Sequence, residues 1–211
     1  MLKSKELQNN VFKKIAFILL FSFSCSLSAL TLEQLQQKLM TDQLLRGDFS
    51  QSKTLQIFEH PLLSSGTFLL SHQQGLVWKQ ASPFPVALVL AKDKLSQQFL
   101  DQAPDVIEAK DNPMVFYFSH LFLSLFKGDM NALKAQFELT LIEVKGHWVL
   151  LLKPKSAPLN KVFSKIEIKG NKQIQGLNLV ELNGDATTIT FTNISTQPAQ
   201  LTEQEKDVFN F

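Results

Sequence analysis

The 211-residue sequence is nearly free of cysteine, since Cys25 is the only one. This residue lies in an N-terminal segment in which Lys13 and Lys14 precede the apolar run 15–23, and small residues then continue to Ala29. Positive charge, an apolar stretch and small residues in this order predict a secretory signal peptide that is cleaved after Ala29. The exported chain would then hold neither a thiol nor a disulfide, so its stability must come from its core.

Two other interpretations of the N-terminal segment are open. One is a membrane anchor that stays attached, although the apolar run is short for a bilayer span. The other is lipid attachment at Cys25, which Ser22 disfavours because such a motif prefers an aliphatic residue there. We therefore expect a signal peptide at residues 1–29 and a single periplasmic domain at residues 30–211, long enough for a sizeable core.

The sequence also lacks an excess of basic charge. The whole chain has a formal charge of +2, but residues 30–211 hold 17 basic and 18 acidic side chains. A surface without net positive charge does not favour binding to the phosphate backbone of nucleic acids. We therefore expect no nucleic-acid partner.

Motifs that carry catalysis or bind a metal are missing as well. The sequence has no Gly-x-Ser-x-Gly nucleophile elbow, no His-Glu-x-x-His pair and no glycine-rich phosphate loop. None of the four histidines has a second ligand residue at metal spacing: His60, His72, His120 and His147. A glycosidase carboxylate pair stays open but without support, because Asp and Glu are spread over turns and strand edges. We expect no enzyme, no metal and no cofactor.

The sequence is rich in short segments with the period of two that is typical of β-strands. Ten strands are expected, at residues 49–58, 66–72, 76–80, 86–91, 94–100, 137–144, 147–152, 164–169, 174–182 and 186–194. Helical segments are expected after Thr31 in a region that Gly47 ends, at 113–126, at 130–136, near 159–163 and after Thr202. Strands in hairpin order with inserted helices predict an α+β, mainly β, fold with one curled antiparallel sheet of about ten strands.

The helix expected at 113–126 is apolar over most of its circumference. Asp111 or Asn112 can cap it, Pro113 fits its first position, and Gly128 can take the left-handed turn after it. At about 21 Å it is too short to cross a bilayer. We expect a narrow polar stripe that faces water, formed by Tyr117, His120, Ser124 and Lys127. The helix is therefore either buried in the core or a cover over an apolar cavity.

Three neighbouring strands would place large apolar side chains on one face of the sheet. These side chains are Phe68, Leu70, Leu76, Trp78, Leu88 and Leu90. They form either an ordinary solid core or the lining of a cavity. A sheet curled round a solid core has little room for a further helix that is apolar nearly all round, whereas a sheet with an open mouth has room. We therefore expect these residues to bind an apolar cargo together with Phe118 and Phe122.

Several short motifs follow one another along the expected mature chain. They are Gly47-Asp-Phe-Ser-Gln51, Ser65-Gly-Thr-Phe68, Leu76-Val-Trp78, Ser82-Pro83, Asn112-Pro113 and Gly128-Asp129. In this order they resemble the LolA-type periplasmic lipoprotein carriers and their divergent relatives. The resemblance implies an unclosed antiparallel β-barrel in which helices form a lid over an apolar cavity. It also implies a carrier that takes lipoprotein acyl chains, or a related lipid, from an inner-membrane exporter to an outer-membrane receptor. We expect the protein to be a monomer.

One position departs from the pattern of that family. Its carriers have an arginine on the second strand that bonds to the lid, and the aligned residue here is His72. A neutral imidazole offers one donor where a guanidinium offers five, so we expect His72 to be a weaker latch. Two alternatives to a carrier stay open. One is a binding module of the same fold that senses lipid or outer-membrane stress, and the other is an enzyme acting on lipid.

Overall fold

The computed structural model describes residues 30–91 and 93–211, so the expected signal peptide lies outside the described residues. The strands are β1 (Leu44–Thr54), β2 (Leu62–Ser71), β3 (Gly75–Ser82), β4 (Val86–Ala91), β5 (Lys94–Phe99), β6 (Asp105–Glu108), β7 (Phe137–Val144), β8 (His147–Pro154), β9 (Phe163–Gly170), β10 (Ile174–Glu181) and β11 (Ala186–Ser195). The helices are α2 (Leu32–Met40), α3 (Pro113–Lys127), α4 (Met130–Gln136) and α5 (Glu203–Val208), with a 3₁₀ turn η1 (Leu159–Lys161).

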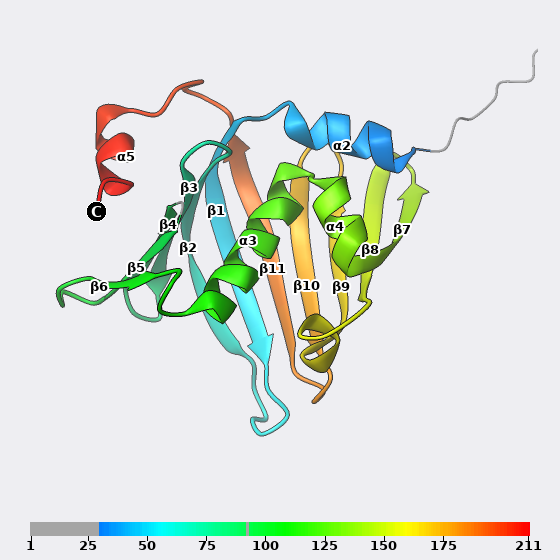
Figure 1. Ribbon diagram of the computed structural model, residues 1–211, viewed down its shortest axis with the longest axis horizontal. Coiled ribbons are helices and arrows are strands. Elements are labelled where there is room, and N and C mark those ends of the chain that lie inside the picture. The colour runs from blue at the N-terminus through cyan, green and yellow to red at the C-terminus, as the bar shows by residue number, and fades with distance from the viewer. Residues whose placement is uncertain (1–29, 92) are drawn as a thin grey trace, which may run out of the picture.

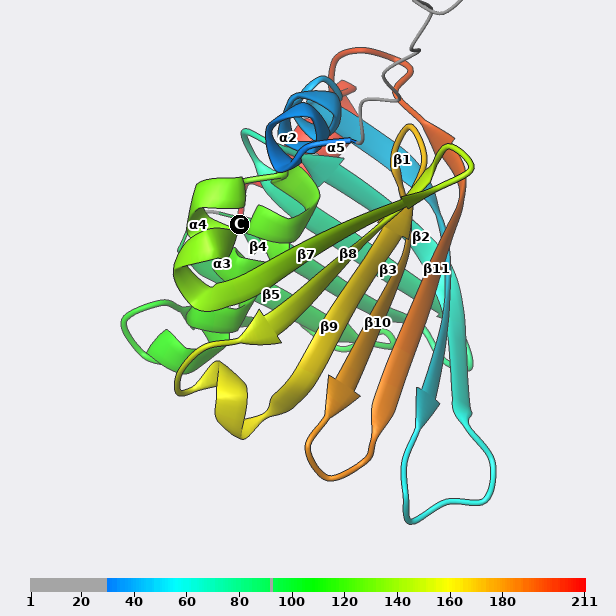
Figure 2. The ribbon, with the colours of Figure 1, turned by 90° about the vertical axis from the view of Figure 1, so that its right-hand side faces the viewer.

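All eleven strands belong to one antiparallel sheet in the order β6-β5-β4-β3-β2-β1-β11-β10-β9-β8-β7. The sheet is strongly curled (Figure 2). Its two edge strands, β6 and β7, do not pair with each other, so the described part of the chain forms an unclosed barrel. The expected α+β, mainly β, fold is confirmed, with eleven strands in place of about ten.

The start of β1 differs from the expectation. The first helix ends at Met40, and Gly47 lies inside β1 instead of ending a helical region. A Cβ atom at Gly47 would come within 2.8 Å of both the Phe68 ring and the carbonyl oxygen of Thr192. This glycine is therefore a close-packing position within the sheet and not a helix terminator.

Strand β6 was not expected, because its residues lie in a segment that reads as a loop. It is four residues long and pairs only with β5, from Lys94↔Glu108 to Gln97↔Asp105. Such a short edge strand exists because a neighbouring strand offers hydrogen-bond partners, and its own sequence pattern is weak.

Helices α3, α4 and α2 lie over one face of the curled sheet, and α3 crosses it obliquely (Figure 1). The ends of α3 are as expected. The Asn112 side chain accepts a hydrogen bond from the backbone N–H of Val115, which settles the choice between Asp111 and Asn112, and Gly128 has a left-handed backbone with φ 64°. No described helix is long and apolar enough to cross a membrane.

The core has two parts, one on each face of the sheet. The larger part lies on the inner face, which we define as the face that carries α3, and it includes side chains of the sheet and of α2, α3 and α4. The smaller part lies on the outer face and consists of Leu44, Leu69, Val77 and Val89 covered by Phe209. Neighbouring residues such as Leu69 and Leu70 belong to opposite parts, as the alternation along a strand requires.

Candidate functional site

The inner face brings together all eight residues expected to bind cargo. Phe68, Trp78 and Leu88 are direct cross-strand neighbours on β2, β3 and β4. Leu70, Leu76 and Leu90 form a second row of neighbours on the same three strands. Because cross-strand neighbours point to the same face, the two rows form a continuous apolar surface. Phe118 and Phe122 of α3 pack against this cluster.

The degree of burial differs within this set. Phe68, Leu70, Leu76 and Leu90 are buried, with 0–7% of their surface exposed. The residues that are only partly buried are Trp78, Leu88, Phe118 and Phe122. Trp78 and Leu88 of the first row and the two phenylalanines of the helix therefore keep accessible apolar surface, while Phe68 and the second row are buried. Whether any of them contacts a cargo stays a prediction.

Three phenylalanines that the sequence reasoning did not single out complete this surface. Phe49 stacks on Trp78 with ring centroids 3.7 Å apart, and Phe191 lies edge-on to Phe68 at 5.2 Å. Phe126 of α3 contacts the same Phe191 ring at 5.3 Å. Phe49 and Phe191 are cross-strand partners of β1 and β11. The period of two along these strands was the available signal, but it does not reveal which strands pair.

Helix α3 is anchored more firmly at its C-terminal end than at its N-terminal end. Three residues near the end of the helix are buried, Leu123, Leu125 and Phe126, whereas near its beginning Phe116 is buried and Met114 is 51% exposed. Gly128, directly after the helix, packs against Leu39 of α2. An opening movement of α3 would therefore disturb fewer contacts at its N-terminal end.

The polar stripe of α3 faces water less completely than expected. His120 is exposed, but Tyr117, Ser124 and Lys127 are only partly so. The expectation was wrong for Tyr117 because α4 lies beside α3, and the Tyr117 hydroxyl donates a 3.0 Å hydrogen bond to Oε1 of Gln136. Burial raises the pKa of this hydroxyl above its ordinary value.

His72, the expected latch, follows directly after β2 and is partly buried. Its backbone N–H donates to the Gln43 carbonyl at 3.0 Å, but its ring Nε2 is buried with no hydrogen-bond partner among the described residues. Burial is the main cause that lowers the pKa of His72, Lys127 on α3 lowers it further, and Asp42 opposes the shift. A latch through Nε2 to the backbone of α3 is not formed in this arrangement, so the role of His72 stays a prediction.

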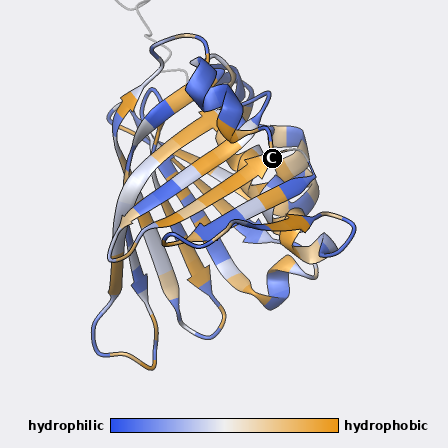
Figure 3. Cartoon of the chain, turned by 90° about the vertical axis from the view of Figure 1, so that its left-hand side faces the viewer, coloured by the Kyte–Doolittle hydropathy of each residue, from blue (hydrophilic) through white to orange (hydrophobic). Residues whose placement is uncertain are grey.

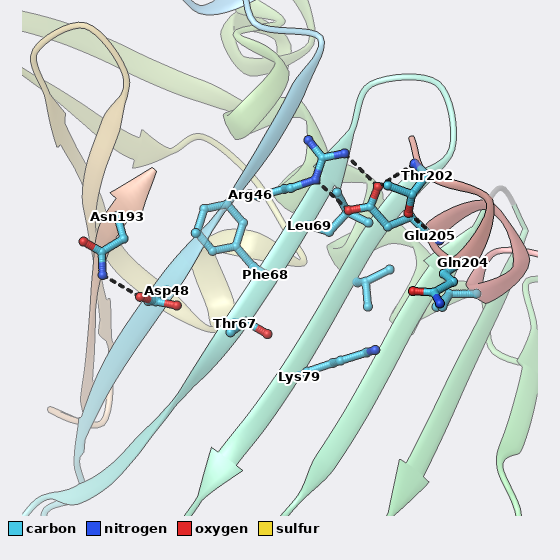
Figure 4. A pocket seen from close by; sticks show the side chains of 13 residues that line it. Arg46, Asp48, Thr67, Phe68, Leu69, Lys79, Asn193, Thr202, Gln204 and Glu205 are labelled. Atoms are coloured by element: carbon cyan, nitrogen blue, oxygen red, sulfur yellow. Dashed lines mark hydrogen bonds and ion pairs between the residues drawn. The ribbon is translucent and has the colours of Figure 1, made fainter. Parts of the chain in front are cut away.

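The outer face carries a polar arrangement that the sequence reasoning missed. Arg46 on β1 donates to both carboxylate oxygens of Glu205 on α5, at 2.6 and 2.7 Å. The same guanidinium donates to the carbonyl oxygens of Pro198 and Gln200 at 2.8 and 3.1 Å. Figure 4 shows this ion pair at the upper end of a groove of about 570 Å³, whose floor includes Leu69. Arg46 therefore fixes the C-terminal segment to the back of the sheet.

A signal for this contact was present in the sequence. Arg46 is the only arginine of the chain, and Thr202 with Glu205 forms the capping box of α5. The ion pair lowers the pKa of Glu205 to about 2, with the hydrogen bond from Arg46 as the main cause. Of the eight expected cargo residues, the groove touches Phe68 alone, so it is distinct from the inner face.

The residues that the structure describes contain no group of three His, Cys, Asp or Glu side chains that could hold a metal ion. The histidines of the sequence are not brought together in the fold, since they lie on separate elements: the β1–β2 loop, the end of β2, α3 and β8. The site is therefore apolar in character, with aromatic rings and leucine side chains from β1–β4, β11 and α3.

Comparison with known proteins agrees with this architecture. The family model described as "Outer membrane lipoprotein carrier protein LolA" matches residues 41–211. A search among curated proteins finds no match.

Several solved structures are similar at low identity. A LolA superfamily protein from Nitrosomonas europaea shares 8% identity with a TM-score of 0.41, over 83% of this chain and 97% of that one. A putative outer membrane lipoprotein-sorting protein domain from Vibrio parahaemolyticus shares 9% with a TM-score of 0.43, over 85% and 98%. A chain of the MucA/MucB complex from Pseudomonas aeruginosa shares 15% with a TM-score of 0.49, over 82% and 59%. Because the family model covers most of the described residues, the chain belongs to the LolA family of outer membrane lipoprotein carrier proteins.

Proposed function

We propose that this protein is a periplasmic carrier that shields the acyl chains of a lipoprotein, or of a related lipid, between the inner and the outer membrane. The cargo would lie between α3 and the two apolar rows of β2, β3 and β4. In this proposal the protein binds and releases its cargo without catalysis. The donor would be an inner-membrane exporter and the acceptor an outer-membrane receptor, as for carriers of this family.

The observation that carries the proposal is the position of α3. A helix with nine large apolar side chains lies across the inner face of an unclosed sheet, and two of its phenylalanines, Phe118 and Phe122, are only partly buried there. Phe118 contacts Phe163 of β9 through the edge of its ring, with centroids 6.2 Å apart. The helix thus offers apolar surface to an acyl chain, which could take the place of the sheet as the partner of these phenylalanines.

The physical chemistry of such a site gives binding without a covalent step. Each methylene group removed from water stabilises the complex by about 0.8 kcal/mol, so the binding energy grows with the length of acyl chain that is covered. Displacing α3 from the same surface costs part of this gain, because its phenylalanines lose their contacts with the sheet. The competition between helix and cargo keeps the net affinity low enough for release to an acceptor.

The proposal is tested by mass spectrometry of an organic extract from natively purified protein that has been exported and processed. We expect an acylated species in near-stoichiometric amount, and uptake of an apolar fluorescent dye once this species is removed. The double variant Phe118→Ser/Phe122→Ser should lower dye affinity about tenfold or more, because the cargo loses contact with two large apolar side chains.

The matched control is Met114→Ser, which changes an exposed apolar residue of the same helix. It should leave dye affinity unchanged. An extract without any acylated species, together with no dye binding by the wild-type protein, would overturn the carrier proposal. Lipid binding that persists while no transfer to acceptor membranes occurs would favour a sensing module of the same fold.

A further inference from the structure

A series of exposed apolar side chains follows the ends of strands β1–β5 at one end of the sheet. We name this set the apolar rim, and it consists of Ile57, Phe58, Leu62, Leu63, Phe84, Phe99 and Leu100. Each of them is at least 42% exposed, and Ile57 reaches 83%. Scattered exposed hydrophobic residues are ordinary, but seven large ones at one end of a molecule mark a surface that contacts something apolar.

The sheet register brings these side chains to the same end. Lys53 pairs with Leu62 where β1 passes into β2, and Ser65 pairs with Ser82 where β2 meets the end of β3. Val86 pairs with Phe99 where β4 begins and β5 ends. The β1–β2 hairpin reaches beyond the neighbouring strand ends, and in Figure 3 it is the lowest loop, with hydrophobic colour at its tip. The rim is therefore a set of protruding tips and not a groove.

Two local features show that the second half of the rim is held in place. The rings of Phe84 and Phe99 are 6.1 Å apart, and the backbone N–H of Leu100 donates to the Pro85 carbonyl at 3.0 Å. Leu100 has a left-handed backbone with φ 53°, a conformation that a leucine rarely adopts. This backbone conformation and the hydrogen bond to Pro85 hold the leucine at the surface, where it is 44% exposed.

The charge of the rim indicates the kind of partner. The three rim segments, residues 54–63, 82–86 and 97–101, contain two charged side chains, Glu59 and Asp101, and Lys53 is the cross-strand partner of Leu62. A rim without net positive charge has no net electrostatic attraction to anionic lipid or to nucleic acid. Protruding, separately spaced apolar tips also fit a deformable apolar medium better than a rigid protein pocket. These features together favour the interfacial region of a lipid bilayer.

We propose that the apolar rim is a membrane-docking edge, which inserts its side chains into the surface of a bilayer whether or not the bilayer carries anionic lipid. This inference rests on the proposed carrier function, because it gives the cargo a short path between bilayer and cavity. Helix α3 begins on the same lower side of the molecule in Figure 1, at its less firmly anchored end. Docking of the rim thus places the movable end of α3 next to the lipid.

The test is flotation of the processed protein with vesicles of pure phosphatidylcholine. We expect the wild-type protein to float with the vesicles, and the fraction bound to change by less than about twofold when a third of the lipid is replaced by phosphatidylglycerol. The variant Ile57→Ser/Phe58→Ser/Phe84→Ser should lose about tenfold or more in partition coefficient, because three apolar side chains no longer enter the bilayer.

The control variant changes three apolar residues at the other end of the molecule that are 43–57% exposed, Met40→Ser/Ile142→Ser/Val144→Ser. It should float like the wild type, and all three proteins should show the same thermal unfolding. Failure of the wild type to bind pure lipid would overturn the inference. So would equal loss in both variants, or binding only to native membranes in a protease-sensitive manner, which would indicate a protein partner.

The outcome for the rim is separable from that for the carrier. Dye affinity in solution reports on the inner face, and the rim variant should keep it because none of its three substitutions lies in the cargo cluster. Vesicle binding without any lipid or dye uptake would leave the rim as a membrane contact and reject the carrier. Dye uptake without vesicle binding would support the carrier and reject the rim as a membrane contact.

Discussion

At the scale of single residues, the ion pair of Arg46 and Glu205 joins two distant parts of the sequence. They are 159 positions apart, and their side chains are only 18% and 22% exposed. An ion pair with two short charge-assisted hydrogen bonds in partly buried surroundings is stronger than an ordinary surface pair. The pair holds α5 over the outer face, directly behind the strands that line the cargo surface.

This pair gives a pH-dependent prediction. Folding lowers the pKa of Glu205 from an ordinary 4.5 to about 2, so the stabilisation is complete above about pH 4.5 and is lost as the pH falls toward 2. Glu205→Gln should therefore lower the free energy of unfolding by about 1–2 kcal/mol at pH 7 and by much less at pH 2.5. Urea unfolding of the variant and the wild type at both pH values measures the difference.

A glutamine at position 205 can keep the side-chain oxygen that accepts from the Thr202 N–H, so the cap of α5 is retained while the charge and one hydrogen bond from Arg46 are lost. Glu203→Gln on the same helix is the matched control and should have little effect, because Glu203 is 85% exposed and its ion pair with Lys206 lies at the surface. An equal loss at both pH values would assign the effect to packing instead of the ion pair.

His72 gives a second prediction at this scale. Its Nε2 is buried without a partner, and burial lowers its pKa below 6.5, so the folded state disfavours the protonated ring. Stability should therefore fall as the pH drops below 6.5, and His72→Phe should remove this loss. At pH 7 the variant should be as stable as the wild type or more stable by up to about 1 kcal/mol. A clear loss of stability at pH 7 in thermal unfolding would contradict this expectation.

At the scale of elements, the sequence was informative where structure depends on neighbours along the chain. The starts of α2 and α5 after Thr31 and Thr202 follow from patterns that span only four residues, and both are confirmed as capping boxes. The period of two also placed Phe68 and Leu70 on one face of β2, because alternation is a property of the strand itself.

The same reasoning failed where structure depends on distant partners. The first residues of β1 read as the end of a helix, but ten register pairs with β2, from Leu44↔Ser71 to Lys53↔Leu62, make them a strand. The approach of Phe126 to Phe191, and of Arg46 to Glu205, depends on how the sheet curls, which no local pattern encodes. The apolar residues of the inner face were thus predictable from the sequence. The contact of α3 with Phe191 and the attachment of the C-terminal segment to the outer face were not.

At the scale of the whole molecule, the proposed carrier requires α3 to move relative to the sheet while the sheet itself stays folded. The sheet holds eleven strands in continuous register, whereas α3 reaches it through side chains such as Phe118 against Phe163 and Phe126 against Phe191. Breaking such contacts costs less than breaking strand pairs, because no backbone hydrogen bond of the sheet is lost. The helix is therefore the element that should open.

This movement can be blocked chemically, since the processed chain would contain no cysteine of its own. In the variant Phe118→Cys/Phe163→Cys, a short bis-maleimide with a reducible spacer would tie the middle of α3 to β9. We expect the cross-linked protein to take up apolar dye at least about tenfold more slowly, because opening of the helix precedes entry of the ligand, and reduction of the spacer to restore uptake. The two single-cysteine variants treated with the same reagent control for the loss of each phenylalanine. Unchanged uptake by the tied protein would show that ligand enters with α3 in place, and the helix would then be a fixed part of the core.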